Sequence, residues 1–420
     1  MSLPRIEDLY DGRTLEQRLA RATPGIRGLI DRVLDEGTLT VDEGVELLES
    51  QGDDVLAIIA AADAIRKADV GDDVTYVVNR NVNFTNICFV GCRFCAFKRH
   101  RSDADAYNQS VETILAKVQE AVDLGATEIC MQGGINPDMP PFTYRDILIA
   151  IKQAFPAIHM HAFSPMEVMY GARRTNMSHA EYLGMLKSHG LGTIPGTAAE
   201  ILDDEVRELL SHKKVDVRTW VEIITTAHRL GIPSTATIMY AHVETPRHVA
   251  AHLQLIRDVQ SETGGFTEFV PLRFIHDNTE MYRDGLVGDP PPKGMYDLRM
   301  YGCTRLLLRG SIDNLQTSWV KINHEFAQLS LNAGCNDFGD TLMEESISRE
   351  AGADAGEYTP VEEIRRLVEG VGRRPVERTT LYKKLEASEE STTRASAAAA
   401  DRPGGRSGSR EVSARPHPLC

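Results

Sequence analysis

Three closely spaced cysteines are the residues of this chain with the clearest chemical potential. Cys88, Cys92 and Cys95 form a C-x₃-C-x₂-C run. Three thiolates on one short loop can hold three irons of a [4Fe–4S] cluster and leave the fourth iron open to another ligand. Structural zinc normally takes four Cys or His ligands at paired spacings, and the nearby His100 has no such spacing. The run therefore predicts an iron–sulfur site with an open position, with zinc as the alternative.

A second group of candidate residues lies where predicted strands end. His159 and His161 lie two positions apart in one predicted strand, and Tyr240, His242 and Glu244 have the same spacing at the end of another. Side chains at this spacing lie on one face of a strand. Buried polar side chains need partners or a ligand, so we expect a polar substrate pocket, with hydrogen-bonded core histidines as the alternative. The other candidates for this pocket are Arg273, Gln316, Asn336 and Asp337.

The elements that must position these residues follow an alternating pattern. From Thr75 onward, short β-branched or apolar runs alternate with amphipathic stretches, in about eight β→α units. The predicted strands cover residues 75–78 with 82–84, 127–131, 158–163, 191–194, 234–240, 267–274, 314–319 and 335–338. This pattern predicts an α/β fold, a (β/α)₈ TIM-type barrel, with an open doubly wound sheet as the alternative. The cysteines then lie in the first β→α loop, on the face where barrel enzymes carry their active sites.

Changes in composition divide the chain into four expected parts. Residues 1–74 read as an N-terminal helical cap, 75–343 as the barrel and 344–386 as closing helices. Residues 387–420 consist mostly of Ser, Thr, Ala, Gly, Pro and Arg and predict a disordered tail.

The charge of the chain limits its partners. The 420 residues include 46 Lys and Arg against 61 Asp and Glu, for a formal charge of −15. This balance argues against nucleic acid or an anionic membrane as a partner. No apolar run approaches the ~20 residues that span a bilayer, and no export signal is visible, so we expect a cytoplasmic protein with reduced cysteines.

The cysteine run, with Phe94 before its last thiol, resembles the radical S-adenosylmethionine (SAM) superfamily. The resemblance implies a [4Fe–4S] cluster whose open iron binds the amino and carboxylate groups of SAM, and reductive cleavage of SAM to a 5′-deoxyadenosyl radical. It places Phe94 behind the adenine and Gln132, Gly133 and Gly134 at the amino group of SAM. The remaining SAM residues that it implies are Ile194, Gly196 and Glu200, although Glu200 falls one residue later than the pattern G-x-I-x-G-x-x-E.

Longer segments are similar to the CofH family of 4-hydroxyphenyl transferases, which act in the synthesis of the deazaflavin Fo. The segments that carry this similarity are MQGGINPD, HMHAFSPMEV, IPGTAAEILDDEVR, ATIMYAHVET, FVPLRF, LQTSWVKI and NDFGDTLMEESISREAGA. The similarity implies that the 4-hydroxybenzyl group of L-tyrosine is joined to 5-amino-6-(D-ribitylamino)uracil with release of iminoacetate, and that CofG is the pathway partner. Ala241 and Asn323 stand where the family has or is expected to have Gly.

Two other functions remain open from the sequence. The menaquinone-pathway enzymes aminofutalosine synthase and dehypoxanthine futalosine cyclase share the cysteine run, and the segment Gly196–Glu200 favours the CofH family over them. A non-catalytic iron–sulfur or zinc-binding scaffold is the alternative from a different class, and it needs a fourth protein ligand.

Overall fold

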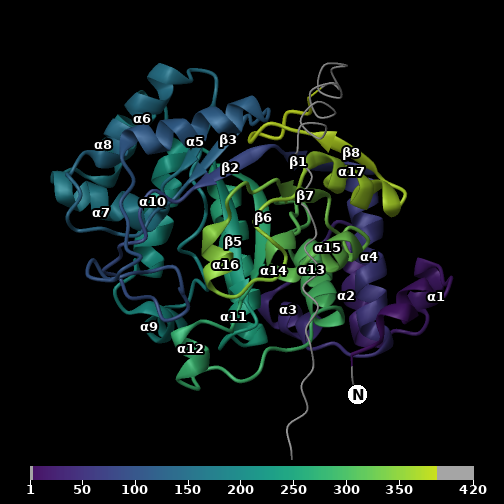
Figure 1. Cartoon of the computed structure of the whole chain (residues 1–420). Helices are drawn as coiled ribbons and strands as arrows, with labels where there is room; N and C mark the ends of the chain where they lie inside the picture. Colours follow the sequence, from purple (N-terminus) through teal and green to yellow (C-terminus); the bar gives the residue numbers. More distant parts are fainter. Residues whose placement is uncertain (1–2, 386–420) are drawn as a thin grey trace, which may run out of the picture. The chain divides into compact units, whose positions relative to one another are not determined.

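Short parallel strands alternate with helices along most of the chain (Figure 1). The structure, a computed structural model, describes residues 3–385, so the tail predicted for residues 387–420 lies outside the described residues. The strands are β1 (Asp73–Val77), β2 (Asn79–Val82), β3 (Glu128–Met131), β4 (His159–Ala162), β5 (Ser234–Tyr240), β6 (Phe266–Arg273), β7 (Asp337–Asp340) and β8 (Arg374–Glu377). The helices before β3 are η1 (Ile6–Tyr10), α1 (Leu15–Leu19), α2 (Pro24–Leu34), α3 (Val41–Leu48), α4 (Asp53–Val70) and α5 (Val111–Asp123). Those between β3 and β6 are α6 (Thr143–Ala154), α7 (Pro165–Thr175), α8 (His179–Ser188), α9 (Asp204–Ser211), α10 (Val217–Arg229) and α11 (Pro246–Thr263). The last helices are α12 (Glu280–Arg283), α13 (Met295–Leu308), α14 (Trp319–Ile322), α15 (His324–Ser330), α16 (Ser346–Glu350) and α17 (Val361–Gly370).

The inner strands follow one another around a ring without forming one continuous sheet. Three parallel sheets have the strand orders β7-β1-β8, β2-β3-β4 and β5-β6, and β2 continues the chain directly after β1. The isolated parallel bridges that connect these sheets are His161 to Thr193, Ile194 to Ser234, Phe269 to Leu315 and Gln316 to Asp337. The predicted strands 191–194 and 314–319 are thus reduced to single bridges at residues 193–194 and 315–316. The fold is an α/β barrel with an interrupted sheet.

Five of the predicted helices agree closely with the structure. The sequence predicts helices over residues 110–124, with Ser110 as the N-cap, and over 178–189, 217–230, 246–262 and 295–308. Helices α5, α8, α10, α11 and α13 begin and end within one residue of these limits. Several begin at a side-chain cap: Ser110 accepts from the N–H of Thr113 before α5, and Asp216 accepts from the N–H of Thr219 before α10. Helix α7 was not predicted. Within residues 3–385, no helix is long and apolar enough to cross a membrane.

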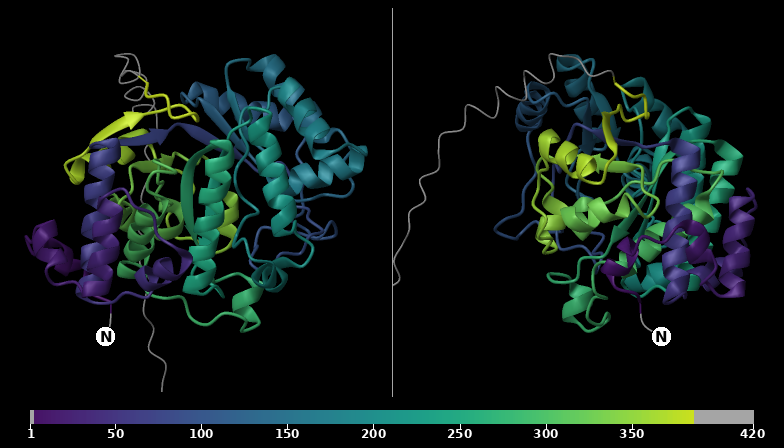
Figure 2. Two further views of the ribbon diagram at one scale, coloured as in Figure 1. Left: turned by 180° about the vertical axis from the view of Figure 1, so that it is seen from behind. Right: turned by 90° about the vertical axis from the view of Figure 1, so that its right-hand side faces the viewer.

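The N-terminal helices pack against the helices of the barrel. α4 contacts α13 and α3 contacts α11, and the second view in Figure 2 shows the purple and blue N-terminal helices beside the green part of the chain. Gly44 in α3 allows a close approach, because a Cβ there would lie 3.1 Å from the Cβ of Ala250 and 3.2 Å from Cδ2 of Leu307. The described residues 3–385 lie in one compact unit.

The C-terminal part of the described chain returns to the first strand. β8 follows α17 and pairs in parallel with β1, with Val376 opposite Thr75. This strand was not predicted, because its residues Arg-Pro-Val-Glu include only one β-branched residue and a proline, which is depleted in strands. Arg378 and Thr380, just beyond β8, line the central cavity, so the C-terminal segment forms part of the cavity wall.

Candidate active site

A cavity of about 390 Å³ occupies the middle of the barrel. The cysteine loop, the ends of several strands and the segment after β8 all contribute to its lining. The predicted site residues that line it are Cys88, Cys92, Cys95, Phe94, Gln132, Gly133, Gly134, Glu200, His161, Arg273 and Gln316. The structure thus brings the predicted cluster loop, most of the predicted SAM residues and a minority of the predicted substrate residues to one space.

The cysteine loop is held to the barrel by its backbone. The N–H of Cys88 donates to the carbonyl of Arg99 at 3.1 Å, and the N–H of Arg93 donates to the carbonyl of Leu210 at 2.9 Å. Gly91, with φ of +75°, occupies the left-handed region that favours glycine. These contacts anchor the loop at its start and in its middle, so the three thiols face the cavity from one ordered segment.

Burial of two of the three thiols disfavours free nucleophilic chemistry. Burial raises the pKa of Cys92 to about 11, and burial raises the pKa of Cys95. A metal ligand must be a thiolate, so the positive charge of bound iron would have to stabilise the thiolate that burial disfavours. The hydroxyl of Ser211 donates to the sulfur of Cys92 at 3.1 Å, which favours the thiolate.

The spacing of these ligands differs from that of a single-ion site. Within residues 3–385, no three Cys, His, Asp or Glu side chains converge closely enough to hold one metal ion. A four-iron cluster is larger than one ion, and its ligand sulfurs lie on separate corners. The three thiols on one cavity wall fit that group.

The segment Gln132–Gly134 leaves β3 beside the cysteine loop. The backbone there is crowded: a Cβ at Gly133 would lie 2.6 Å from the ring of Phe84, and one at Gly134 would lie 2.3 Å from the carbonyl oxygen of Ile87. The two glycines are therefore required by packing inside the protein. They bring the backbone to the cavity next to the cluster loop.

Glu167 is a buried carboxylate of this wall that sequence reasoning missed. Its oxygens accept from the N–H of Gly133 at 3.0 Å and from the N–H and hydroxyl of Ser164 at 2.7 Å each. Burial raises the pKa of Glu167 to about 7 despite these donors. The signal that could have found it is the capping-box spacing Ser164-x-x-Glu167, which also marks the start of the unpredicted helix α7.

Glu200 is held in a buried ion pair at the cavity wall. Its carboxylate lies 2.5 Å from Nζ of Lys214 and 3.5 Å from the guanidinium of Arg207. Burial alone would lower the pKa of Lys214, but Glu200 and the nearby Cys92 raise it above its usual range. Nζ of Lys214 also lies 4.9 Å from the ring centroid of Phe94. Lys214, which sequence reasoning missed, thus links the predicted adenine-side residues to the cluster loop.

Ile194 and Gly196 lie behind this wall and do not line the cavity. Ile194 is fully buried, and its N–H donates to the carbonyl of Pro233. The N–H of Gly196 donates to the hydroxyl of Thr235 at 2.8 Å, and a Cβ on Gly196 would lie 2.0 Å from the carbonyl oxygen of Thr235. The structure gives these two residues a packing role against β5.

The predicted substrate residues divide between the cavity and separate buried networks. His161 lines the cavity, and burial lowers its pKa to about 4, so the ring is neutral. His159 and His161 both bond the hydroxyl of Thr193, at 2.9 and 2.7 Å, which agrees with the alternative of hydrogen-bonded core histidines. Gln316 lines the cavity, and its amide donates to Glu268 at 3.3 Å.

Tyr240 and Arg273 share the fully buried carboxylate of Asp297. The hydroxyl of Tyr240 donates to it at 2.8 Å, and the guanidinium of Arg273 lies 2.5 Å from it. Arg273 still lines the cavity, whereas Tyr240 does not. His242 donates to the carbonyl of Met239 at 2.9 Å and lies 3.3 Å from Glu244, and neither His242 nor Glu244 lines the cavity.

Asn336 and Asp337 also lie outside the cavity lining. The side-chain oxygen of Asn336 accepts from Arg305 at 2.8 Å, and Asp337 pairs with Arg378 at 2.5 Å. Both were predicted as substrate residues because they follow a strand. The structure uses them to tie neighbouring segments together.

Three acidic residues and Arg378 form a polar floor that was not predicted. Glu128 and Asp340 both accept from the side-chain amide of Asn79, at 3.0 and 2.8 Å. Glu268 lies 3.4 Å from Arg378. Burial raises the pKa of Glu268 to about 7 and that of Asp340 to about 8. A barrel interior is usually filled by branched aliphatic residues, so this floor indicates a polar ligand.

Unpartnered polar atoms on the lining support that conclusion. The side-chain oxygens of Asn81 and Asn83 are buried, line the cavity and accept no hydrogen bond from the described residues. Buried acceptors without partners are costly, and a bound ligand can supply the missing donors.

Comparisons with known proteins agree with this geometry. Residues 82–256 match the model of the radical SAM superfamily, and residues 263–391 match the CofH/MqnC C-terminal region. Two solved structures have the same fold at 16% identity. One is methylornithine synthase (PylB), with a TM-score of 0.64 over 83% of this chain and 97% of that one. The other is HydG, a maturase of the [FeFe]-hydrogenase, with a TM-score of 0.67 over 89% of this chain and 82% of that one. The fold and the cysteine loop define a radical SAM enzyme.

Relatives with higher sequence identity indicate which family of radical SAM enzymes the chain belongs to. The chain is 48% identical over 358 residues to the 5-amino-6-(D-ribitylamino)uracil–L-tyrosine 4-hydroxyphenyl transferase of Methanothermobacter thermautotrophicus, covering 85% of this chain and 97% of that protein. It is 51% identical over 348 residues to the FO synthase of Streptomyces avermitilis, covering 83% of this chain and 40% of that longer protein. The chain belongs to the family of the 5-amino-6-(D-ribitylamino)uracil–L-tyrosine 4-hydroxyphenyl transferases.

Proposed function

We propose that this chain joins the 4-hydroxybenzyl group of L-tyrosine to 5-amino-6-(D-ribitylamino)uracil in deazaflavin synthesis. The observation that carries the proposal is that the cysteine loop and the polar floor of the barrel face one cavity. The name of the 48% identical relative supplies the two substrates. A volume of about 390 Å³ lies within the range of small-molecule sites.

The residues of the loop fit the cofactors of the superfamily. Cys88, Cys92 and Cys95 would hold the [4Fe–4S] cluster, and the wall of Phe94, Gln132–Gly134 and Glu200 would hold SAM. When both are bound, the cluster and SAM supply a radical that abstracts a hydrogen atom, in the proposal from the amine of tyrosine. The protein must hold the two substrates in line with that radical and exclude water and other hydrogen donors.

The residues that line the cavity account for the binding of the substrates and for the exclusion of water. The floor offers carboxylates and amides, which suit the amine and hydroxyl groups of a ribitylaminouracil. Aliphatic and aromatic side chains, including Val270, Leu272 and Phe274, complete the wall. These side chains carry no polar groups that would hold water beside the substrates by hydrogen bonds.

Of the alternatives, the menaquinone-pathway enzymes share the C-terminal family, whose description includes MqnC as well as CofH. The match to this family model alone does not distinguish the CofH transferases from the menaquinone-pathway enzymes. The 48% identity to a transferase over nearly its whole length favours the proposed reaction. CofG, as the enzyme acting next on the product, is part of the proposal.

One anaerobic assay tests the function. The cluster-loaded protein is incubated with dithionite, SAM, L-tyrosine and 5-amino-6-(D-ribitylamino)uracil, and single omissions of each substrate are run in parallel. The proposal expects 5′-deoxyadenosine together with a coupled product whose mass contains both the hydroxybenzyl group and the diaminouracil. SAM cleavage without coupling would assign the chain to another radical reaction. An intact cluster that does not cleave SAM would support the non-catalytic scaffold.

A further inference from the structure

One cationic side chain of the cavity has no anionic partner. Five cations line the cavity, and four of them are paired with carboxylates. The pairs are Lys98 with Glu280 at 2.7 Å, Lys214 with Glu200 at 2.5 Å, Arg273 with Asp297 at 2.5 Å and Arg378 with Asp337 at 2.5 Å. The fifth is Lys321, whose ammonium makes no hydrogen bond or ion pair with any residue of the described range 3–385.

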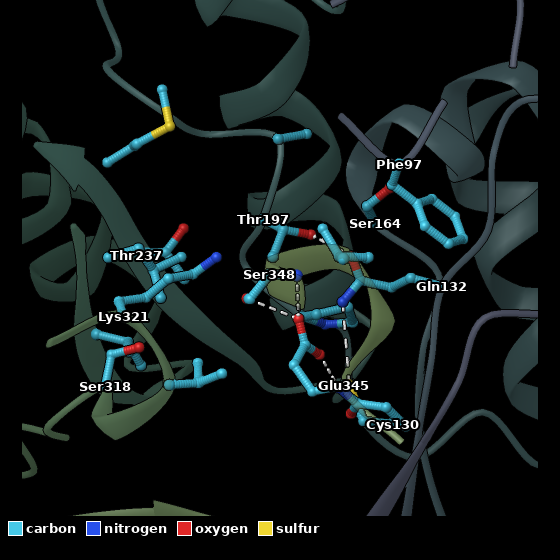
Figure 3. Close-up of a pocket in the computed structure, with 18 of the residues that line it drawn as sticks. Phe97, Cys130, Gln132, Ser164, Thr197, Thr237, Ser318, Lys321, Glu345 and Ser348 are labelled. Atoms are coloured by element: carbon cyan, nitrogen blue, oxygen red, sulfur yellow. Dashed lines mark hydrogen bonds between the residues drawn. The ribbon is translucent and has the colours of Figure 1, made fainter. Parts of the chain in front are cut away.

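Lys321 is placed across the pocket from Gln132, one of the predicted SAM residues (Figure 3). It belongs to α14, which follows the bridged residues 315–316, whereas Gln132 follows β3. Figure 3 shows Lys321 and Ser318 on one side of the pocket and Gln132 on the other, with the amine of Lys321 pointing into the space between them. A ligand group bound by Lys321 would therefore lie across the cavity from the Gln132 wall.

Within residues 3–385, no carboxylate forms an ion pair that compensates the charge of the Lys321 ammonium. Burial lowers its pKa, while Glu345 and Cys95 act to raise it. Glu345 is committed to other donors: its carboxylate accepts from the N–H of Ser348 at 2.9 Å, from the hydroxyl of Ser348 at 2.7 Å and from the amide of Asn81. An ammonium desolvated in this way gains most from a ligand that brings its own negative charge.

We propose that Lys321 binds the carboxylate of the amino-acid substrate. The inference rests on the proposed function, in which the ribitylaminouracil carries no carboxylate and L-tyrosine carries one. SAM also carries a carboxylate, but Gln132, one of its predicted residues, lies across the pocket from Lys321 (Figure 3). Lys321 would thereby hold the backbone end of tyrosine near the cluster loop, to which Cys95 belongs, and leave the aromatic ring toward the floor. It is a positioning residue for the substrate.

Ligand binding to three variants tests this assignment. Lys321→Met keeps the length of the side chain and removes its charge, Lys321→Arg keeps the charge, and Lys67→Met is a matched control at an exposed lysine of α4. Dissociation constants are measured by anaerobic calorimetry on cluster-loaded protein with SAM present. The probes are L-tyrosine, 3-(4-hydroxyphenyl)propionate, which has a carboxylate and no amine, and tyramine, which has an amine and no carboxylate.

The proposal expects a pattern across the probes rather than a general loss. Lys321→Met should weaken tyrosine and the propionate by about 10- to 100-fold, the range of a charge-assisted hydrogen bond. Tyramine binding should change less than threefold, Lys321→Arg should recover part of the loss, and Lys67→Met should match the wild type. The KM for tyrosine should rise in the same variant while the KM for the uracil substrate stays unchanged.

Three results would overturn the assignment. One is equal weakening of tyramine and tyrosine. Another is a higher dissociation constant for SAM in Lys321→Met without an effect on tyrosine, which would place the SAM carboxylate here. The third is an altered electron paramagnetic resonance spectrum of the reduced cluster with normal tyrosine binding, which would make Lys321 a counter-charge for the cluster.

If the wild type turns over but Lys321→Met has the same affinity for tyrosine as the wild type, this inference fails and the proposed function stands. If the wild type binds no tyrosine, the proposed function itself fails.

Discussion

Replacement of Arg378 by Met should destabilise the folded protein by about 3–5 kcal/mol. The guanidinium is 2% exposed and makes two bonds to Asp337, from Nε at 2.5 Å and from an amino group at 3.1 Å. Asp337 is fully buried, so the variant leaves its charge without compensation. The neighbouring Glu268, with a pKa of about 7, can relieve its own lost contact by taking up a proton and should add little near neutral pH.

The assay is urea unfolding of the anaerobic, cluster-loaded protein, followed by circular dichroism at pH 7. The double variant Arg378→Met with Asp337→Asn should recover about 1–2 kcal/mol of the loss, because it removes the stranded charge. A loss below about 1 kcal/mol, or a double variant less stable than the single one, would refute the reasoning. The first result would show that Asp337 is solvated or protonated once its partner is gone.

Three further predictions concern the cluster loop, a strained alanine and a buried carboxylate. Cys92→Ala should keep the circular dichroism of the fold and lose the visible absorbance of the cluster, whereas Cys303→Ala in α13 should keep both; a full cluster signal in Cys92→Ala would contradict the assignment. Ala241→Gly should stabilise the protein by about 0.5–1 kcal/mol in the same urea assay, because Ala241 has φ of +68° and only glycine adopts that region without cost; a destabilised variant would show that the backbone is not strained there. Burial raises the folded-state pKa of Glu167 to about 7, above the usual 4.5, so its contribution to stability is present below pH 4.5 and is lost as the pH rises through 7. The unfolding free energy of the wild type minus that of Glu167→Gln should therefore fall by about 1 kcal/mol per pH unit between pH 5 and 7, and a flat or rising difference would count against the raised pKa.

The parts of the fold that were predictable are those with a strong local signal. The cysteine spacing and the amphipathic helices, such as α5 and α10, depend on residues close in sequence. Ala241 and Asn323 are a similar case: both stand where a glycine was expected, and both have positive φ, at 68° and 76°. A missing glycine at such a position indicates backbone strain from the sequence alone.

The parts that were not predictable depend on contacts between distant segments. The sequence predicts strands over residues 191–194 and 314–319, but the structure pairs residues 193–194 and 315–316 through single bridges alone. Such an interruption of the sheet depends on the neighbouring strands and not on the local pattern. Tyr240 was predicted to meet substrate because it ends a strand, but Asp297, 57 positions later, takes its hydroxyl.

The same limit applies to the two lysines of the cavity wall. Lys214 follows α9 and Lys321 lies in the short helix α14. Lys321 falls within the segment LQTSWVKI that resembles the CofH family, but neither lysine stands at a spacing that marks it as functional. Their importance becomes visible only when the ring of strands places them on one cavity with the cysteine loop.

The pairing of β5 with β6 has a consequence for engineering of this enzyme class. The superfamily region ends at residue 256 and the C-terminal family region begins at residue 263, so the junction between them falls in α11, between two hydrogen-bonded strands of one wall. A recombinant joined at that junction would inherit its radical-generating half from one parent and the half containing Gln316, Lys321 and Arg378 from the other. Such hybrids would exchange the part of the cavity wall that carries these three residues, provided that the registers of β5 with β6 and of β8 with β1 are kept.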